Sequence, residues 1–485
     1  LALACASIAL PAAAQGLQTS FEPGQPAPAA AAGDGALQVR IGSGPAAPYA
    51  AKPGVGYSGL HALHYASTGG EARRQLFKAD LTIEADTTLS WLVLPEIVGK
   101  DTVASTYVSL DLVLDDGTRV SGSAARDHHG VALGARAQGD SKTLYPQQWA
   151  RKAVRLGDTP ALRGRRVVAL ELEVASADGA PVAGWIDDVR LEAQPRHTPQ
   201  RPSDWALTTR GTQANGTFSR GNNFPATAVP HGFNFWTPVT DAGSLTWLYR
   251  WNEQNDAANR PALQALALSH QPSPWMGDRQ TFQVMPSASR GVPEADRSKR
   301  ALSFSRDNEQ ARPYRYDVRF DNGIAASIAP TDHAAIFRFE FPEGGDANLL
   351  FDNVDARGGL TLDAATQTLT GYTDTRSGLS TGATRMYVVA SFDRPWRSSG
   401  TVKTGRPTGY IKFDAGADRR VSMRIATSLI SVEQARHNLA LELSAADDVD
   451  RVAARAQDAW DQRLARFDVG DATDDQKTTL YSNLY

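Results

Sequence analysis

The sequence predicts a mainly β protein in which a β-sandwich, a larger two-sheet β-sandwich and a final set of helices follow one another. Two observations predict this order. Apolar and polar residues alternate in short runs from about residue 36 to residue 430, and Gly, Asn and Asp residues separate the runs. After residue 430, apolar residues recur at helical spacing instead. The 485 residues exceed the size of one ordinary domain, which agrees with several units.

The first sandwich is predicted over residues 36–194. Residues 108–114 alternate between Val or Leu and mostly polar side chains, and Asp116-Gly117 then predicts a hairpin turn. Residues 168–174 alternate in the same way. Short alternating strands without a long amphipathic helix are typical of a β-sandwich. Three Pro residues among polar residues then predict a semi-rigid linker over residues 195–204.

The second sandwich is predicted over residues 205–430. Asp321-Asn322-Gly323 and Glu343-Gly344-Gly345 have the composition of turns between its strands. The number of runs is large enough for two facing sheets. The clearest predicted strands are 316–320, 324–328, 336–341, 349–351, 386–392 and 421–425.

Helices are predicted from residue 431 to the last residue. Ser431 and Gln434 have the spacing of a capping box, and a second helix is expected from about Asp448. Thr473 and Gln476 predict the cap of a third helix. Because no helix-ending residue follows before Tyr485, we expect the sequence to be truncated inside this helix.

The first residues predict export. Residues 1–14 read as the end of an apolar signal peptide with a small-residue cleavage site after Ala14, and residues 15–35 read as a low-complexity linker. The expected location is periplasmic or secreted. Cys5 is the one cysteine and lies in the leader, so lipid anchoring at Cys5 is an open alternative.

Charge and hydropathy exclude two classes of partner. The formal net charge is −3, and no basic field is present that would bind nucleic acid. Outside the leader, no segment reaches the roughly 20 apolar residues that a membrane-spanning helix needs. We therefore expect no nucleic-acid partner and no transmembrane segment.

The stretch from Asn215 to Pro286 carries the candidate site. It holds four of the ten Trp residues beside Asn, His and Asp, and Gly and Pro favour rigid loops. Aromatic faces can stack on the C–H face of a sugar ring while polar groups bond its hydroxyls. The alternative is that Trp247 and Trp251 pack between two sheets and that the polar residues only brace turns. The candidate substrate-binding residues are Gly221, Asn222, Asn223, Trp247, Trp251, His270 and Asp278.

Several motifs in this stretch and beyond it resemble glycoside hydrolase family 92, the exo-acting α-mannosidases. Asn222-Asn223-Phe224-Pro225-Ala226 with Pro230-His231-Gly232-Phe233 is similar to one family motif, and residues 269–278 resemble the segment that follows. Asn222 and Asn223 stand where many members have His and Thr, and Ala226 stands for Gly. Linkage specificity and the natural glycan therefore stay open. Further matches are residues 314–318, 337–342, 428–435 and 480–485, in the family's order.

The resemblance implies an inverting, calcium-dependent α-mannosidase that acts on terminal mannose of glycans. It implies that residues 205–430 are the family's N-terminal sandwich and that residues 431–485 are linker helices and the start of an incomplete α/α catalytic domain. The catalytic acid, the catalytic base and most calcium ligands are then expected beyond Tyr485, so they are unknown here. Residues 1–485 alone are expected to be inactive.

The first sandwich resembles a jelly-roll carbohydrate-binding module at its two ends, Phe21-Glu22 and residues 184–191. Asp187 and Asp188 can be ligands of a structural calcium or ordinary solvated carboxylates. Two rival functions remain at this point. One is a non-catalytic carbohydrate-binding protein built from two β-sandwiches, and the other is a lyase with a similar large sandwich.

Overall fold

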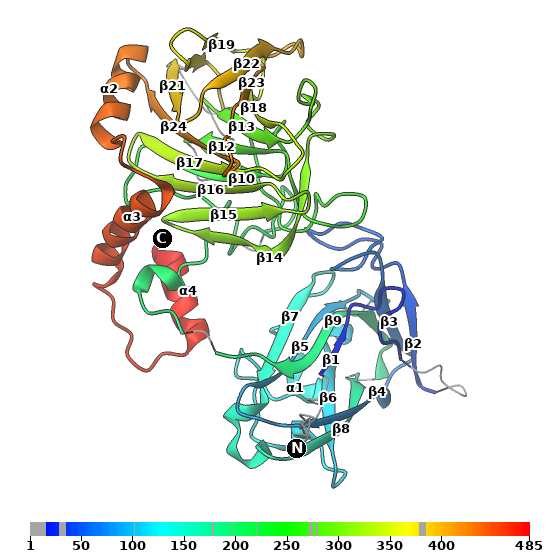
Figure 1. Cartoon of the computed structure of the whole chain (residues 1–485). Coiled ribbons are helices and arrows are strands. Elements are labelled where there is room, and N and C mark those ends of the chain that lie inside the picture. The colour runs from blue at the N-terminus through cyan, green and yellow to red at the C-terminus, as the bar shows by residue number, and fades with distance from the viewer. Residues whose placement is uncertain are drawn as a thin grey trace, which may run out of the picture. The chain divides into compact units, whose positions relative to one another are not determined.

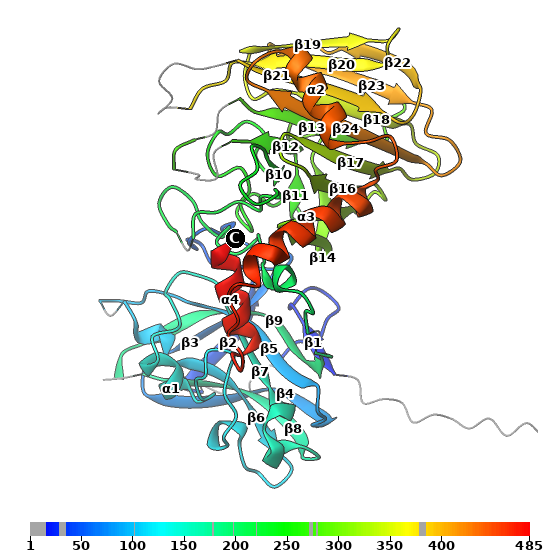
Figure 2. The ribbon, with the colours of Figure 1, turned by 90° about the vertical axis from the view of Figure 1, so that its left-hand side faces the viewer.

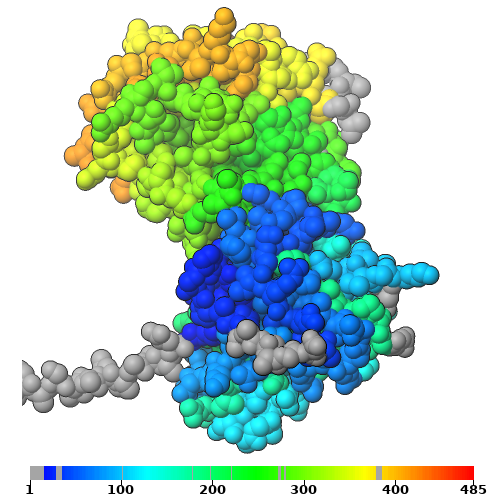
Figure 3. All heavy atoms as spheres, turned by 90° about the vertical axis from the view of Figure 1, so that its right-hand side faces the viewer, coloured from blue at the N-terminus to red at the C-terminus, as the bar shows by residue number. Residues whose placement is uncertain are grey.

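The chain folds into two compact units, residues 1–197 and residues 198–485. The computed structural model describes residues 16–28, 35–100, 102–176, 179–196, 198–219, 221–270, 275–277, 280–377 and 385–485. Blue and cyan spheres in Figure 3 mark residues of unit 1, and green, yellow and orange spheres mark residues of unit 2. The predicted leader at residues 1–14 and Cys5 lie outside the described residues. No helix in the described part of the chain is long and apolar enough to span a membrane.

Unit 1 is a β-sandwich (Figure 1). In its described residues, one sheet has the strand order β2-β3-β9-β5-β7 with β1 beside β9, and the other has the order β4-β8-β6. A short helix, α1, packs near β6 and β8. The elements are β1 (Leu17–Thr19), β2 (Leu37–Gly42), β3 (Ala62–Ser67), β4 (Glu71–Thr82), β5 (Thr87–Pro95), β6 (Val108–Leu114), α1 (Ala135–Asp140), β7 (Ala150–Arg155), β8 (Arg166–Ala175) and β9 (Val182–Ala193).

The core of unit 1 lies between these two sheets and begins earlier in the sequence than predicted. Leu110 and Leu172, which face inward as the alternation predicts, are fully buried. Leu17–Thr19 pairs antiparallel with β9, and Phe21 is only 2% exposed in the same core. The prediction that residues 15–35 form a linker is therefore wrong at its start. The pattern of three residues was too short to indicate a strand without its partner.

Unit 2 contains the larger sandwich. Its described strands form a six-stranded sheet in the order β10-β12-β13-β18-β23-β22 and a nine-stranded sheet in the order β11-β14-β15-β16-β17-β24-β21-β20-β19. The strands are β10 (Phe235–Val239), β11 (Ala262–Leu263), β12 (Ala265–Ser269), β13 (Phe282–Ser287), β14 (Leu302–Arg312), β15 (Arg315–Phe320), β16 (Ala325–Pro330), β17 (Ala334–Glu340), β18 (Ala347–Asp352), β19 (Gly358–Asp363), β20 (Thr368–Thr373), β21 (Met386–Phe392), β22 (Trp396–Thr401), β23 (Gly409–Phe413) and β24 (Arg420–Ser428).

One aromatic-rich core joins the two sheets of unit 2. Trp236 of β10 meets Phe337 of β17 edge-to-face with ring centroids 5.3 Å apart, and both side chains are buried. Phe282 and Phe351 stack within the six-stranded sheet. Large aromatic rings contribute most of the buried area in such a core. The predicted two-sheet sandwich is confirmed.

Three helices, α2 (Val432–Glu442), α3 (Val449–Leu464) and α4 (Asp474–Leu484), end the described chain. Their caps are those the sequence predicts. Asp448 accepts a hydrogen bond from the backbone N–H of Arg451, and Thr473 and Gln476 form a reciprocal capping box. At α2 only half of the predicted box forms: Ser431 accepts from the Gln434 N–H, while the Gln434 side chain donates to Asn438 instead. In Figure 2, α2 lies against the sheet that contains β21 and β24.

The turn between α2 and α3 contains an aspartate whose ion pair depends on pH. The Asp447 carboxylate accepts hydrogen bonds from Ser444 and pairs with Arg455 at 2.5 Å. The Arg455 bond, with those from Ser444, lowers the pKa of Asp447 to about 2.

Because the folded pKa lies below the unfolded value of about 3.9, this contact stabilises the fold above pH ~4 and is lost as the pH falls toward 2. We expect melting temperatures of the wild type to fall more steeply between pH 4 and pH 2 than those of Asp447→Asn. Parallel melting curves for the two proteins across that range would contradict this prediction.

Candidate functional site

Residues 210–211, just before the predicted stretch, support two of its candidate residues. The backbone N–H of Asn223 donates to the Gly211 carbonyl at 3.0 Å, and the Asn223 side chain donates to the Arg210 carbonyl at 3.2 Å. Gly221 has φ +133°, and a Cβ there would lie 2.3 Å from the Cα of Gly211. Only glycine fits that approach and that backbone angle. Gly221 and Asn223 therefore fix the loop. This agrees with the alternative that these residues brace a turn.

Asn222 differs from its neighbours. It has φ +59°, and its side-chain oxygen Oδ1 is buried without a hydrogen-bond partner among the described residues. A buried amide oxygen without a partner costs free energy unless a ligand or water satisfies it. The Asn222 oxygen is thus a buried acceptor that the described residues leave without a hydrogen bond.

Trp247 supports a second tryptophan and is not itself an open stacking surface. Trp247 is 8% exposed, and its ring meets Trp275 edge-to-face with centroids 4.9 Å apart. Trp275 is 57% exposed and its neighbour Met276 is 42% exposed. The structure therefore places the accessible indole at Trp275. The sequence offered a signal for this, because Trp275 lies in a Pro- and Gly-rich loop rather than in an alternating run.

Trp251 is held against the core by a buried polar cluster. The guanidinium carbon of Arg306 lies 3.9 Å from the Trp251 ring centroid, so that face of the indole is covered. Glu309 fixes Arg306 at 2.7 Å and accepts hydrogen bonds from the hydroxyls of Tyr249 and Tyr316. This contact agrees with the alternative that Trp251 packs in the core, because an arginine side chain occupies the ring face on which a sugar would stack.

His270 joins the two sheets at one end of the sandwich. It directly follows β12, and its ring nitrogens lie 3.3 Å from the Phe233 carbonyl and 2.9 Å from the Met386 sulfur at the start of β21. Its ring also packs on Phe233 at 5.1 Å. These contacts give His270 a bracing role at the edge of the site.

Loops from both sheets meet around Trp275. A Cβ at Gly277 would lie 3.7 Å from the Leu245 carbonyl, from Thr246 and from Ser377. The Gln280 N–H donates to the Thr375 carbonyl, which ties the same loop to the strand end at β20. Asp278, the last predicted site residue, lies outside the described residues. The exposed indole is therefore carried by loops that bond to one another.

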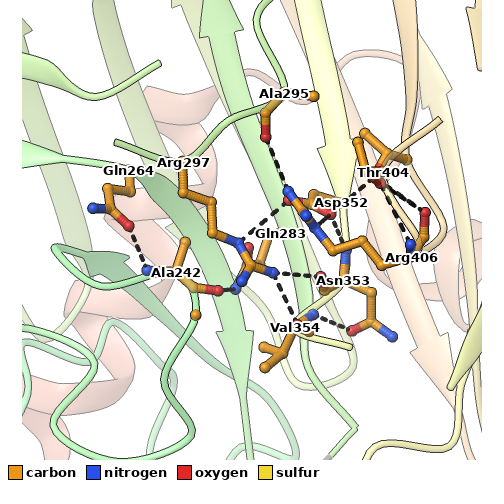
Figure 4. A network of polar contacts seen from close by, with 12 residues as sticks. Ala242, Gln264, Gln283, Ala295, Arg297, Asp352, Asn353, Val354, Thr404 and Arg406 are labelled. Atoms are coloured by element: carbon orange, nitrogen blue, oxygen red, sulfur yellow. Dashed lines mark hydrogen bonds and ion pairs between the residues drawn. The ribbon is translucent and has the colours of Figure 1, made fainter. Parts of the chain in front are cut away.

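A buried ionic network around Asp352 holds the loop at residues 353–354 (Figure 4). Asp352, at the end of β18, is 1% exposed and accepts from Arg300 at 2.8 Å and from Arg406 at 2.6 Å. Arg297 donates to the carbonyls of Asn353 and Val354. Since buried guanidinium groups need partners on all sides, each arginine also holds a loop carbonyl. The loop that follows β18 carries Asn353, and the side-chain amide of Asn353 donates hydrogen bonds to the hydroxyls of Thr373 and Thr375.

The C-terminal helices anchor the segment that follows Asn223. The indole N–H of Trp460 in α3 donates to the Ala228 carbonyl at 2.7 Å, and the Tyr485 hydroxyl donates to the Ala226 carbonyl. The two rings contact each other with centroids 4.9 Å apart. The loop with Asn222 is thus attached to the helical segment, which the sequence did not indicate.

The calcium that the family resemblance implies needs a group of oxygen ligands. No group of three or more His, Cys, Asp or Glu side chains in the part of the chain that the structure describes is placed so that it could hold a metal ion. The calcium stays a prediction, with its ligands expected mostly outside residues 1–485.

Asp187 in unit 1 is neither solvated nor placed with two further acidic ligands. It is fully buried, and its carboxylate accepts backbone hydrogen bonds from Tyr57 at 2.7 Å and Ser58 at 3.1 Å. Burial and the neighbouring charge of Asp188 raise the pKa of Asp187 well above its usual range. The solvated alternative is wrong for Asp187, which holds the backbone of residues 57–58 against β9.

Comparison with known proteins identifies the second unit. Residues 208–428 match the glycosyl hydrolase family 92 N-terminal domain, and residues 434–485 match the family's catalytic domain. The family 92 inverting mannosidase of Bacteroides thetaiotaomicron is 30% identical, with a TM-score of 0.54 over 60% of this chain and 40% of that one. An uncharacterised secreted glycosidase of Arthroderma benhamiae is 23% identical over 56% of this chain and 40% of its own length.

The chain spans about 40% of the length of these relatives. The two family matches follow each other in the chain and together cover more than half of it. The chain belongs to glycoside hydrolase family 92.

Proposed function

We propose that this chain is the N-terminal part of an exported glycoside hydrolase that removes terminal α-linked mannose from glycans with inversion. The observation that carries the proposal is the order of the two family matches, an N-terminal domain followed by a catalytic domain. The similarity to an inverting mannosidase supports the choice of reaction. Export rests on the apolar leader at residues 1–14.

The sandwich contributes binding groups and not the reacting acids. Trp275 offers an exposed indole that can stack on the C–H face of a sugar, and Trp247 supports it from the side. The Asn222 oxygen can accept a hydrogen bond from a hydroxyl, which would satisfy a buried acceptor. Both groups bind and orient a sugar, and neither transfers a proton.

Inversion needs two carboxylates about 6.5–9.5 Å apart, one to protonate the leaving oxygen and one to activate water. We assign neither role to a described residue. In this proposal the acid, the base and the calcium ligands belong to the remainder of the catalytic domain, as in the family resemblance. The sandwich then forms one wall of the pocket.

The test is hydrolysis of a panel of α-linked mannobioses by the protein that carries the complete catalytic domain, with and without a chelator. Release of mannose as the β-anomer, seen by NMR, and loss of activity with chelator are expected. Glycan binding without hydrolysis would favour the carbohydrate-binding alternative, and an unsaturated sugar product would favour a lyase.

Residues 1–485 alone are expected not to hydrolyse mannosides, because the described residues supply binding groups without an assigned acid and base. The measurement is mannose release from the purified 485-residue chain over long incubation. Turnover above the buffer control would contradict this prediction and would place the reacting carboxylates within the chain.

A further inference from the structure

A second candidate binding site lies in unit 1, away from the family 92 match. A concavity of about 570 Å³ opens where the hairpin after β6 meets the turn before β8, at the three-stranded sheet that Figure 1 labels β4, β6 and β8. Arg73 of β4, Arg119 and Arg165 line it, each from a separate segment. Its lining includes no Asp and no Glu. We call this concavity the arginine pocket.

Carboxylates hold two of the three guanidinium groups from the sheet side. Arg73 pairs with Glu173 at 2.8 Å, and Nε of Arg119 pairs with Glu171 at 2.9 Å. Both glutamates are largely buried residues of β8, with side chains 12% and 14% exposed. The bond to Glu171 keeps the pKa of Arg119 above its ordinary value, so this group stays charged.

Arg165 is held from the hairpin tip, where one terminal nitrogen pairs with Asp116 at 2.6 Å and with Asp115 at 3.4 Å. A guanidinium group has five N–H donors, and each of the three arginines uses one nitrogen in these ion pairs. The carboxylates therefore orient the three forks and leave further N–H groups for a ligand.

The remaining lining is suited to a small polar ligand with some apolar surface. Leu114 and Leu162 belong to the core of unit 1 and contribute apolar atoms to the pocket. Ser121 adds a hydroxyl, and its backbone N–H donates to the buried Asp111 carboxylate at 3.0 Å, which fixes the turn. The three arginines are the charged residues of this lining, and their carboxylate partners do not line it.

We propose that the arginine pocket binds a sugar that carries an oxyanion, namely a carboxylate, a sulfate or a phosphate. Planar guanidinium forks match the paired oxygens of these groups, and charge-assisted bonds of this kind are stronger than neutral ones. The pocket lies in residues 73–165, outside residues 208–428 and 434–485, so this site goes beyond the proposed hydrolase function.

The test is calorimetric titration of the whole chain with glucuronic acid, glucose 6-sulfate, mannose 6-phosphate and neutral methyl α-mannoside. Inorganic phosphate and inorganic sulfate are titrated in the same way for comparison. We expect at least one charged sugar to bind more tightly than its inorganic ion, with affinity that falls as salt rises. Which charged sugar binds identifies the oxyanion. Binding by none of the charged sugars, or equal binding of the inorganic ion, would overturn the proposal.

Arg165→Gln is the informative variant, because its partners are half exposed and such pairs contribute about 0–1 kcal/mol to stability. We expect it to weaken binding at least about fivefold, a change that the loss of a charge-assisted bond readily gives. Arg166→Gln is the matched control. Arg166 is adjacent in the sequence, pairs with Asp80 at 2.6 Å and does not line the pocket, and its substitution removes the same charge.

Equal loss of affinity in both variants would mean nonspecific attraction and would overturn the site. Mannosidase activity on neutral substrates is a separate readout. In the protein that carries the complete catalytic domain, it should be the same with Arg165→Gln as in the wild type, so failure of this proposal leaves the proposed hydrolase function untouched.

Discussion

Replacing Trp275 by alanine is expected to lower kcat/KM for α-mannobioses by about 10- to 100-fold, in the protein that carries the complete catalytic domain. The reason is the loss of an exposed indole at the centre of the loops that meet there, where aromatic residues often dominate binding. Such a loss corresponds to about 1.4–2.7 kcal/mol of transition-state stabilisation. The measurement is steady-state kinetics, with the melting temperature recorded for each variant.

Two further variants separate stacking from general damage to the loop. Trp275→Phe keeps an aromatic face and should recover part of the activity. Met276→Ala removes a neighbouring side chain that is 42% exposed and should have a small effect. If Trp275→Ala keeps full activity, or if Met276→Ala lowers it equally, the indole is not a sugar-binding surface.

Replacing Lys152 by methionine is expected to destabilise unit 1 by about 3–5 kcal/mol. Lys152 and Asp127 form an ion pair at 3.0 Å whose side chains are 1% and 0% exposed. Burial lowers the pKa of Lys152, and Asp127 with its charge opposes that shift. Removing the lysine leaves Asp127 as a buried charge without its cation, and Thr143 loses the hydrogen bond from the ammonium.

Differential scanning calorimetry of the whole chain measures this effect as a fall of the unit 1 transition by about 10 °C. Lys78→Met, which changes an exposed lysine of β4, is the control and should leave the transition in place. The double variant Asp127→Leu with Lys152→Met removes both charges and should be more stable than Lys152→Met alone. A Lys152→Met protein that melts with the wild type would contradict the argument.

The strands of both sandwiches could be predicted because the order of apolar and polar residues in a strand depends on which side chains are buried. In β6, Leu110 and Leu112 point into the core of unit 1 as the period of two predicts, although Ser109 and Asp111 on the other face are buried as well, and the turn after the strand needs the backbone freedom of Gly117. The caps at Asp448 and Thr473 were equally local, since each bonds an N–H three residues ahead.

The sequence supported a hypothesis about where the candidate site lies, but it could not assign roles to the residues of that stretch. Trp247, Trp251 and Trp275 have the same side chain, yet one is a support, one is stacked by Arg306 and one is open. The Pro and Gly residues around Trp275 are the one local signal of its exposure, whereas nothing near Trp247 or Trp251 in the sequence indicates which group covers each ring. Asn222 and Asn223 likewise differ only in whether residues 210–211 supply a partner.

The sequence by itself determined the mainly β class, the helical end and the family resemblance. Tertiary structure alone decided which indole is exposed, that β1 (Leu17–Thr19) completes the first sandwich, and that Trp460 and Tyr485 hold the segment beside Asn222. It also brought Arg73, Arg119 and Arg165 to one concavity. The physical reason is range: propensity and capping act within a few residues, whereas burial and pairing depend on groups far apart in the chain.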